Sequence, residues 1–235
     1  MENEVSIKRP RKWVKTLTKT LLLGSVSVVV LLLVAQIIWV FSGSNEWKFV
    51  GEKNGVKVYT LKSPGSDLVQ AKAVFRVHSS LTGIVKFMQS EDTCKDVGCY
   101  EERIVDQEDD QLRYDYFRMD LPAPFRPRDF SVRVHVYQSP RTKEVLIDYS
   151  AAPGKVPLND CCVRVTDMND TWRLTPLGNG EVEIELIMNL NEGGFIPHLL
   201  LNMARPKVMY GLSGLQSLFS EEKYQTAKLN FIQEK

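Results

Sequence analysis

The sequence predicts an α+β protein in which a curved antiparallel sheet is covered by a long C-terminal helix, with one transmembrane helix preceding both. Three observations predict this class. An uncharged apolar run fills residues 21–41, apolar and polar residues alternate through most of residues 47–190, and helical spacing begins after residue 195. With 235 residues, 43% hydrophobic and 25% charged, the chain can hold one sizeable domain beyond the apolar run.

The apolar run LLLGSVSVVVLLLVAQIIWVF has the length of a membrane span. As a helix it would extend about 31 Å, which matches the hydrocarbon core of a bilayer. The alternative is a cleaved secretory signal, whose apolar core is usually about 7 to 15 residues long and ends in a small-x-small site. This run is longer, and Leu-Val-Ala at 33–35 is a poor cleavage site. We therefore expect an uncleaved anchor.

Charge predicts the orientation of that anchor. The first 19 residues carry six Lys or Arg against two Glu, a net +4, so the rest of a chain of net charge +1 carries −3. The positive-inside rule places the N-terminus in the cytoplasm and the remainder outside it, in the periplasm if the cell is Gram-negative. A mildly acidic body also argues against a nucleic-acid partner. The predicted organisation is a basic cytoplasmic arm (1–20), a transmembrane helix (21–41), a domain (46–220) and a polar tail (221–235).

Four cysteines give an independent indication of compartment. Cys94 and Cys99 are separated by KDVG, which a turn could close into a disulfide, and an oxidising compartment would permit that bond. Adjacent Cys161 and Cys162 are expected to be buried free thiols. The three histidines are scattered along the chain, so no metal site is expected.

Period-two patterns predict roughly seven to nine strands after the anchor. Residues 56–61 (VKVYTL) and 69–77 (VQAKAVFRV) predict two strands, and Ser79 or Ser80 can cap a short helix, LTGIVKFMQS. In FSVRVHVYQ and VEIELIMNL the alternation is regular enough that one face must be buried and the other wet.

The stretch GGFIPHLLLNMARP begins the final helix, which we expect from about residue 197 to residue 220. Pro197 suits a first helical turn, and Pro206 should kink the helix. Its apolar stripe is expected to face the sheet, because a sheet with one apolar face needs a cover. The stripe comprises Ile196, Leu199, Leu200, Met203, Val208, Leu212, Leu215 and Leu218.

In order and spacing these features resemble a START domain, the steroidogenic acute regulatory protein-related lipid transfer module, over about residues 46–219. The most specific pieces are Arg128-Asp129-Phe130, Val163-Arg164-Val165 with Trp172 and Pro176, and Gly194 before Ile196-Pro197. The arrangement of an anchor followed by an extracytoplasmic domain resembles that of a bacterial, membrane-attached member of the START family. The resemblance implies a helix-grip fold whose apolar tunnel, between sheet and C-terminal helix, holds one lipid without a cofactor and without chemistry.

The resemblance also implies roles for particular residues. Ligand-facing candidates on the sheet and the helix are Val132, Val134, Leu186, Met188, Ile196, Leu200, Met203 and Met209. Arg128 is expected to anchor the preceding turn, Asp129 to pair within the sheet, and Trp172, Gly194 and Pro197 to serve the fold. Arg164 points outward if its valine neighbours pack inward; in the opposite register it becomes a buried cation able to meet a lipid headgroup. Gly193 and Gly194 together suit a hinge.

Two other functions stay open. One is a cyclase- or hydrolase-like enzyme on the same scaffold, although the sequence has no G-x-S-x-G elbow, clustered histidines or phosphate loop. The other is an interaction module that binds no lipid. Sterol, hopanoid, phospholipid and quinone would all fit an apolar tunnel with one polar end. Shielding such a lipid from water would be worth on the order of 10 kcal/mol.

Overall fold

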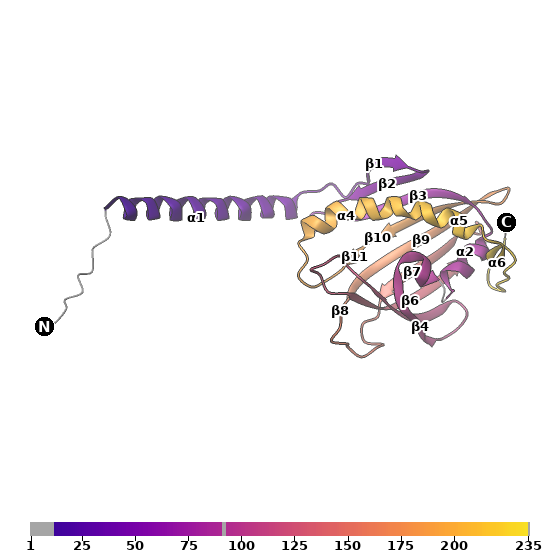
Figure 1. Cartoon of the computed structure of the whole chain (residues 1–235). Helices are drawn as coiled ribbons and strands as arrows, with labels where there is room; N and C mark the ends of the chain where they lie inside the picture. Colours follow the sequence, from indigo (N-terminus) through magenta and orange to yellow (C-terminus); the bar gives the residue numbers. More distant parts are fainter. Residues whose placement is uncertain (1–11, 91–92, 235) are drawn as a thin grey trace.

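The computed structural model describes residues 12–90 and 93–234. Its first element is the helix α1 (Lys12–Phe41), which contains a candidate membrane span over Thr16–Phe41 whose side chains are not buried in the protein. Figure 1 shows α1 as an isolated rod leaving one end of a folded domain. The Lys8, Arg9 and Arg11 of the expected basic arm lie outside the described residues.

The domain is built on an antiparallel sheet with the order β1-β2-β3-β10-β9-β7-β6-β5-β4. Short strands add to it, because β11 pairs with β9 and β8 runs parallel to β6. The strands are β1 (Lys48–Lys53), β2 (Val56–Leu61), β3 (Gln70–His78), β4 (Cys99–Gln107), β5 (Leu112–Met119), β6 (Arg128–Gln138), β7 (Val145–Ala151), β8 (Val163–Arg164), β9 (Asp167–Gly178), β10 (Glu181–Met188) and β11 (Leu190–Asn191).

The two faces of the sheet differ as the alternation predicts. On β6 the side chains of Phe130, Val132, Val134 and Val136 are buried on the inner face, and β3 and β10 supply matching apolar positions. Successive side chains of a strand point to opposite faces, so a sheet with one buried and one solvated face alternates apolar and polar residues. The predicted α+β fold class is therefore confirmed, since helices cover one side of a curved antiparallel sheet (Figure 1).

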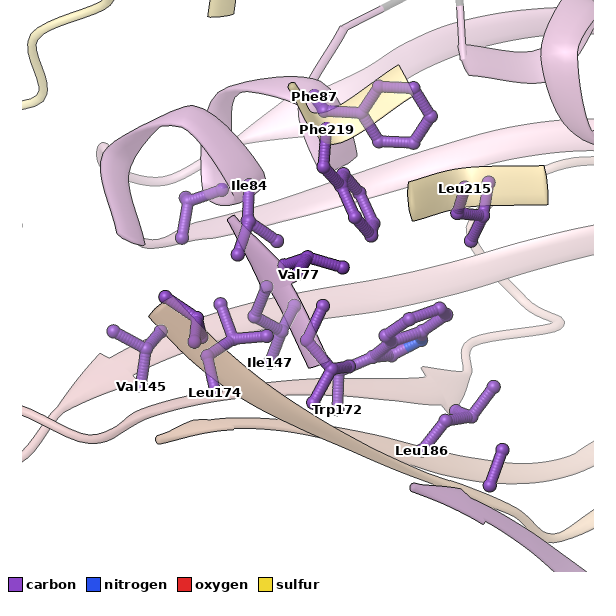
Figure 2. Packing of buried hydrophobic residues seen from close by; sticks show 14 of the residues in the cluster. Val77, Ile84, Phe87, Val145, Ile147, Trp172, Leu174, Leu186, Leu215 and Phe219 are labelled. Atoms are coloured by element: carbon purple, nitrogen blue, oxygen red, sulfur yellow. The ribbon is translucent and has the colours of Figure 1, made fainter. Parts of the chain in front are cut away.

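Short helices and one long helix cover the inner face. They are α2 (Leu81–Met88), α3 (Thr93–Val97), α4 (His198–Gly211), a 3-10 turn η1 (Leu212–Gly214), α5 (Leu215–Phe219) and α6 (Glu222–Gln225). Ser80 caps α2 by accepting a hydrogen bond from the Gly83 backbone N–H. Figure 2 shows Phe87 of α2 beside Phe219 of α5; their ring centroids are 5.0 Å apart with the rings edge to face.

The C-terminal helix differs from its prediction in two ways. The helix expected to run without a break to about residue 220 changes to a 3-10 turn at Leu212–Gly214, which follows Gly211 and ends at Gly214; glycine weakens helix propensity. The buried face is also different, because α4 buries Arg205 and Met209 while Leu199, Leu200 and Met203 remain exposed. Arg205 turns inward because its guanidinium donates to the carbonyls of Val69 and Leu190.

The expected polar tail, residues 221–235, is part of the domain as far as residue 234. Tyr224 and Ile232 are buried in the core. The Glu234 carboxylate accepts hydrogen bonds from the backbone N–H groups of Leu81 and Thr82, at 3.0 and 2.9 Å, at the start of α2. A carboxylate is favourable there because a helix N-terminus carries unpaired N–H groups and a positive dipole end.

The two outermost strands of the sheet are irregular. The pairing of β1 with β2 shifts register between Phe49 and Gly51. The pairing of β4 with β5 shifts twice, between Tyr100 and Arg103 and again between Ile104 and Asp106. Such bulges bend an edge strand and interrupt its hydrogen-bond ladder.

Candidate functional site

A cavity of about 290 Å³ lies between the inner face of the sheet and the helices. Its wall is mainly apolar and comes from α2, α3, the strands β4, β5, β7 and β9, and the α4–α5 segment. The residues that line it are Phe87, Met88, Thr93, Cys94, Val97, Cys99, Glu102, Asp115, Phe117, Met119, Tyr149, Met168, Asp170, Trp172, Val208, Leu212 and Leu215. An apolar hollow with a few convergent polar groups is the usual form of a small-molecule site.

The first polar group in the wall belongs to a buried ion pair on β5. Asp115 Oδ2 lies 2.8 Å from Nη2 of Arg113, two residues earlier on the same face of the strand. Arg113 also donates to the backbone carbonyls of Gln89 and Met88 at the end of α2. Asp115 Oδ1 and Arg113 Nε are buried without a hydrogen-bond partner among the described residues. Burial raises the pKa of Asp115 although the arginine acts in the opposite direction.

The second polar group is Asp170 on β9. Its Oδ1 accepts a hydrogen bond of 2.7 Å from the Asn189 backbone N–H. Burial raises the pKa of Asp170 to about 7. Tyr149 of β7, its neighbour across the sheet, also lines the cavity, and burial raises the pKa of the Tyr149 hydroxyl. These groups give the cavity an acidic and strongly desolvated polar side.

The two carboxyl groups lie on separate parts of the wall. Strand β5 pairs with β6, β6 with β7 and β7 with β9. Three strand spacings of about 4.8 Å place their backbones roughly 14 Å apart along the curved sheet. Asp115 and Asp170 therefore stand on different strands of one cavity wall, and each offers a ligand its own contact.

The outer face of the sheet holds a different buried pair. Arg164 Nη2 lies 2.7 Å from Asp129 Oδ2, and both side chains are almost fully buried. The remaining donors of Arg164 bind the backbone carbonyls of Pro153, Val156 and Pro157 in the loop that covers this face. Arg164 lies on the opposite side of the sheet from the cavity. Arg164 is therefore buried and paired, not exposed to solvent, and it does not line this cavity; its contact with a ligand stays a prediction.

Arg128 holds the segment that leads into α4. Its guanidinium donates to the backbone carbonyls of Arg126, Glu192 and Gly193 at 2.5–2.7 Å. Gly194 has φ +68°, and a Cβ there would lie 3.0 Å from Arg128 Nη2, so both its conformation and the close approach require glycine. Pro197 stands at the N-cap of α4. The pair of glycines expected to hinge α4 is therefore held by Arg128.

None of the nine residues predicted to bind ligand lines this cavity in the described part of the chain. Sheet residues Val132, Val134 and Leu186 are buried in the packed core, Met188 packs against it, and Ile196 and Met209 are buried near α4. Leu200 and Met203 face solvent, because α4 is rotated about its axis relative to the prediction. Trp172, predicted to serve only the fold, is part of the cavity wall; Figure 2 shows its side chain among the buried residues of the core.

Sequence reasoning missed Arg113 and Asp115, although a signal was present. In LRYDYFRM the alternation places these two charged residues on the same face as Phe117 and Met119. A charged pair on an otherwise apolar face indicates either a buried ion pair or a ligand contact.

Both cysteine pairs form disulfides. Cys94 and Cys99 are bonded as predicted, and both line the cavity beside α3. Cys161 and Cys162 are also bonded to each other, which corrects the expectation of free thiols. The glutamate carboxyl nearest the first pair, Glu102, accepts a hydrogen bond of 3.2 Å from the Cys94 backbone N–H.

Comparison with solved structures identifies the architecture. Over 74% of this chain and 99% of the other, the fold matches a STAR-related lipid transfer protein fragment from Xanthomonas axonopodis with a TM-score of 0.69 and 22% identity. Human StAR-related lipid transfer protein 5 matches with a TM-score of 0.63 and 19% identity, covering 83% of this chain and 94% of its own. The domain has the START fold.

Sequence comparison alone is less informative about this START fold. No family model matches the sequence. An uncharacterized protein of Pseudomonas aeruginosa is 27% identical over 162 residues, which cover 68% of this chain and 79% of that protein. The cavity is lined both by strands of the sheet and by Val208, Leu212 and Leu215 of the C-terminal helical segment.

Proposed function

We propose that this protein is a membrane-tethered lipid-binding domain that holds one hydrophobic ligand in the cavity beneath α4 and α5. The observation that carries the proposal is an apolar cavity that contains a buried carboxylate with an unpartnered oxygen, Asp115 Oδ1. The START fold supports it, because the similar solved structures are named lipid transfer proteins. Apolar walls that remove a lipid tail from water account for binding without chemistry.

The polar groups of the cavity favour one class of lipid. Asp115 is already paired with Arg113, and the residues that line the cavity include no Lys, Arg or His that could bind an anionic phosphate. A neutral hydroxyl can donate a hydrogen bond to Asp115 Oδ1 after a small rotation of the carboxylate. This bond would give a partner to an oxygen that has none among the described residues. We therefore favour a hydroxyl-bearing lipid of the sterol or hopanoid class over phospholipids and quinones.

The proposed anchor is α1, inserted with its N-terminus in the cytoplasm and the domain outside. Its 26-residue candidate span and the net charge of the residues before it support this orientation. A domain held directly at its own membrane takes lipid locally, because only residues 42–47 separate α1 from β1.

Native mass spectrometry of residues 44–235 tests the proposal. We expect one lipid per chain, identified after extraction as a hydroxyl-bearing polycycle. Leu212→Trp should abolish the adduct by filling the cavity, whereas Leu200→Trp, on the exposed side of α4, should leave it unchanged. A protein that stays free of ligand after incubation with mixed liposomes would overturn the lipid-binding function.

One observation favours an enzyme as the second candidate. Two carboxyls with raised pKa values, Asp115 and Asp170, line one apolar cavity, which is the environment that acid–base residues require. The test is the extracted ligand itself. A ligand recovered chemically changed from the one supplied, with the change lost in Asp170→Asn, would favour catalysis; an unchanged ligand would favour carriage.

A further inference from the structure

The end of the domain from which α1 leaves exposes large apolar side chains. Phe195 is 98% exposed and Leu199 is 69% exposed. Both lie where the chain passes from β11 into α4, and Figure 1 places this passage beside the C-terminal end of α1. A surface hollow lined by Trp39 of α1 and by Ile196 and Leu199 joins the two elements. The apolar surface of α1 is therefore continuous with that of the domain.

The junction between α1 and the domain is built from specific polar contacts. The Lys62 ammonium donates to the carbonyls of Val40 and Ser42 at 3.2 Å each, at the C-terminal end of α1. The Gly65 backbone N–H donates to the same Val40 carbonyl at 2.8 Å. A cation at a helix C-terminus also interacts favourably with the helix dipole. These contacts fix the end of α1 on the loop that follows β2.

The same loop holds the beginning of α4. The carbonyl of Asp67 accepts hydrogen bonds both from Trp39 Nε1 of α1, at 3.1 Å, and from Asn202 Nδ2 of α4, at 2.8 Å. The Asp67 carboxylate lies 2.5 Å from His198 Nδ1, and Asn202 Oδ1 accepts from the Val69 backbone N–H. Because one residue binds both helices, the exposed side chains of the β11–α4 passage keep a set position relative to α1.

We propose that the domain docks on the surface of the membrane that α1 spans, with Phe195 and Leu199 inserted at the interface and the orientation set by the Lys62–Asp67 junction. This inference rests on the proposed membrane anchor. The occupant is a lipid surface because the patch adjoins Trp39 at the end of the candidate span, where aromatic side chains occupy the interface of a bilayer. Exposed apolar side chains at this position are then covered by lipid.

Spin-label accessibility in the full chain tests the docking. The four native cysteines are all in disulfides, so one introduced cysteine carries the label alone. The labelled variants are Phe195→Cys, Leu199→Cys, Val29→Cys in the middle of α1, and Leu177→Cys as the matched control. Leu177 is 41% exposed and lies at the end of β9, just before the turn to β10. Gly178 and Gly180 of this turn line a hollow together with Glu234. Figure 1 shows the C-terminal end of the chain far from α1.

The protein is reconstituted in vesicles of phosphatidylethanolamine and phosphatidylglycerol. We expect the collision rate with a water-soluble nickel chelate to be several-fold lower at positions 195 and 199 than at position 177. Accessibility at position 195 equal to that at 177, with position 29 shielded, would overturn docking while leaving the anchor intact. Exposure of position 29 would overturn the anchor and the docking together.

Lys62→Ala tests what sets the orientation. Removing the ammonium takes away its hydrogen bonds to the end of α1 and to the carbonyls of Ser63 and Ser66 in the loop that holds α1, and it leaves the core untouched. We expect the nickel collision rate at position 195 to rise several-fold toward that of position 177, while position 29 stays shielded. An unchanged rate at position 195 would show that the junction does not orient the domain. Lys57→Ala, on the neighbouring strand β2, is the matched control and should have no effect.

Discussion

Two buried arginine–aspartate pairs lie on opposite faces of the same sheet and differ in what covers them. On the outer face, the guanidinium of Arg164 binds Asp129 and three backbone carbonyls of the covering loop. On the inner face, Arg113 and Asp115 each retain one buried polar atom without a partner, and Asp115 borders the cavity. Asp129 Oδ1 also lacks a partner among the described residues, so the two pairs differ in access: the covering loop closes off the outer pair, whereas the inner pair borders a cavity from which a ligand could reach it.

The largest expected effect comes from breaking the outer pair. In Arg164→Leu the Asp129 carboxylate would remain buried without its partner, so the free energy of unfolding should fall by about 3–5 kcal/mol. Urea denaturation of residues 44–235 measures it. Arg76→Leu breaks an exposed pair with Glu183 and should cost at most about 1 kcal/mol. Equal losses in the two variants would remove the distinction between the outer pair and a surface pair.

A pH titration extends the comparison to Asp170, a buried carboxyl on the inner face. Because burial raises the pKa of Asp170 to about 7, the folded protein keeps its proton where the unfolded chain has lost it. Stability should thus fall as pH rises from about 4 to about 7 and then level off, by on the order of 4 kcal/mol. Asp170→Asn should lack this decline in urea denaturation, whereas Asp167→Asn, an exposed change on the same strand, should retain it. A decline that persists in Asp170→Asn would assign it to other groups.

Asp115→Asn tests the inner pair as a ligand contact. An amide at this position is less able to accept a hydrogen bond from a ligand hydroxyl, so affinity should fall about tenfold, equivalent to roughly 1.4 kcal/mol. Arg113 keeps its bonds to the end of α2, and stability should change less than in Arg164→Leu. Dilution followed by native mass spectrometry measures ligand retention. The control is Asp148→Asn on the outer face, where the carboxylate binds Thr171; equal losses in both variants would argue against a direct contact.

The smallest expected effect comes from Tyr116→Phe. The hydroxyl of Tyr116 accepts a 2.8 Å hydrogen bond from Arg118 Nε and lies 3.4 Å from Asp129 Oδ2, so it supports the outer pair from one side. Its loss should lower the free energy of unfolding by about 0.5–1.5 kcal/mol. Ligand retention should not change. A change in retention without a change in stability would mean that the two faces are coupled.

The sequence predicted the parts of the fold that depend on local pattern. Alternation located the strands, the Ser80 cap located α2, and the apolar run located α1. The orientation of α4 could not be predicted in the same way, because apolar residues occur on more than one side of it. Its inner face is chosen by Arg205, whose partners are the distant carbonyls of Val69 and Leu190.

The cavity wall was less predictable than the fold. Periodicity identifies which side chains point inward, but it does not distinguish a filled interior from a hollow one. Val132 and Val134 point inward as expected and are packed, while Trp172 and Leu212 border the space. That difference depends on how α3 and the α4–α5 segment sit over the sheet, which arises from contacts between distant residues.

The irregular outer strands β1 and β4 have a consequence for molecules anchored side by side. Confining a protein to a membrane raises its local concentration, and an open sheet edge is a template for joining sheets of neighbouring copies. Here one edge is bulged at Phe49–Gly51 and the other is bulged twice and carries Glu101, Glu102 and Arg103. If α1 anchors the domain as proposed, crowding in the plane of the membrane should therefore leave these domains as separate units.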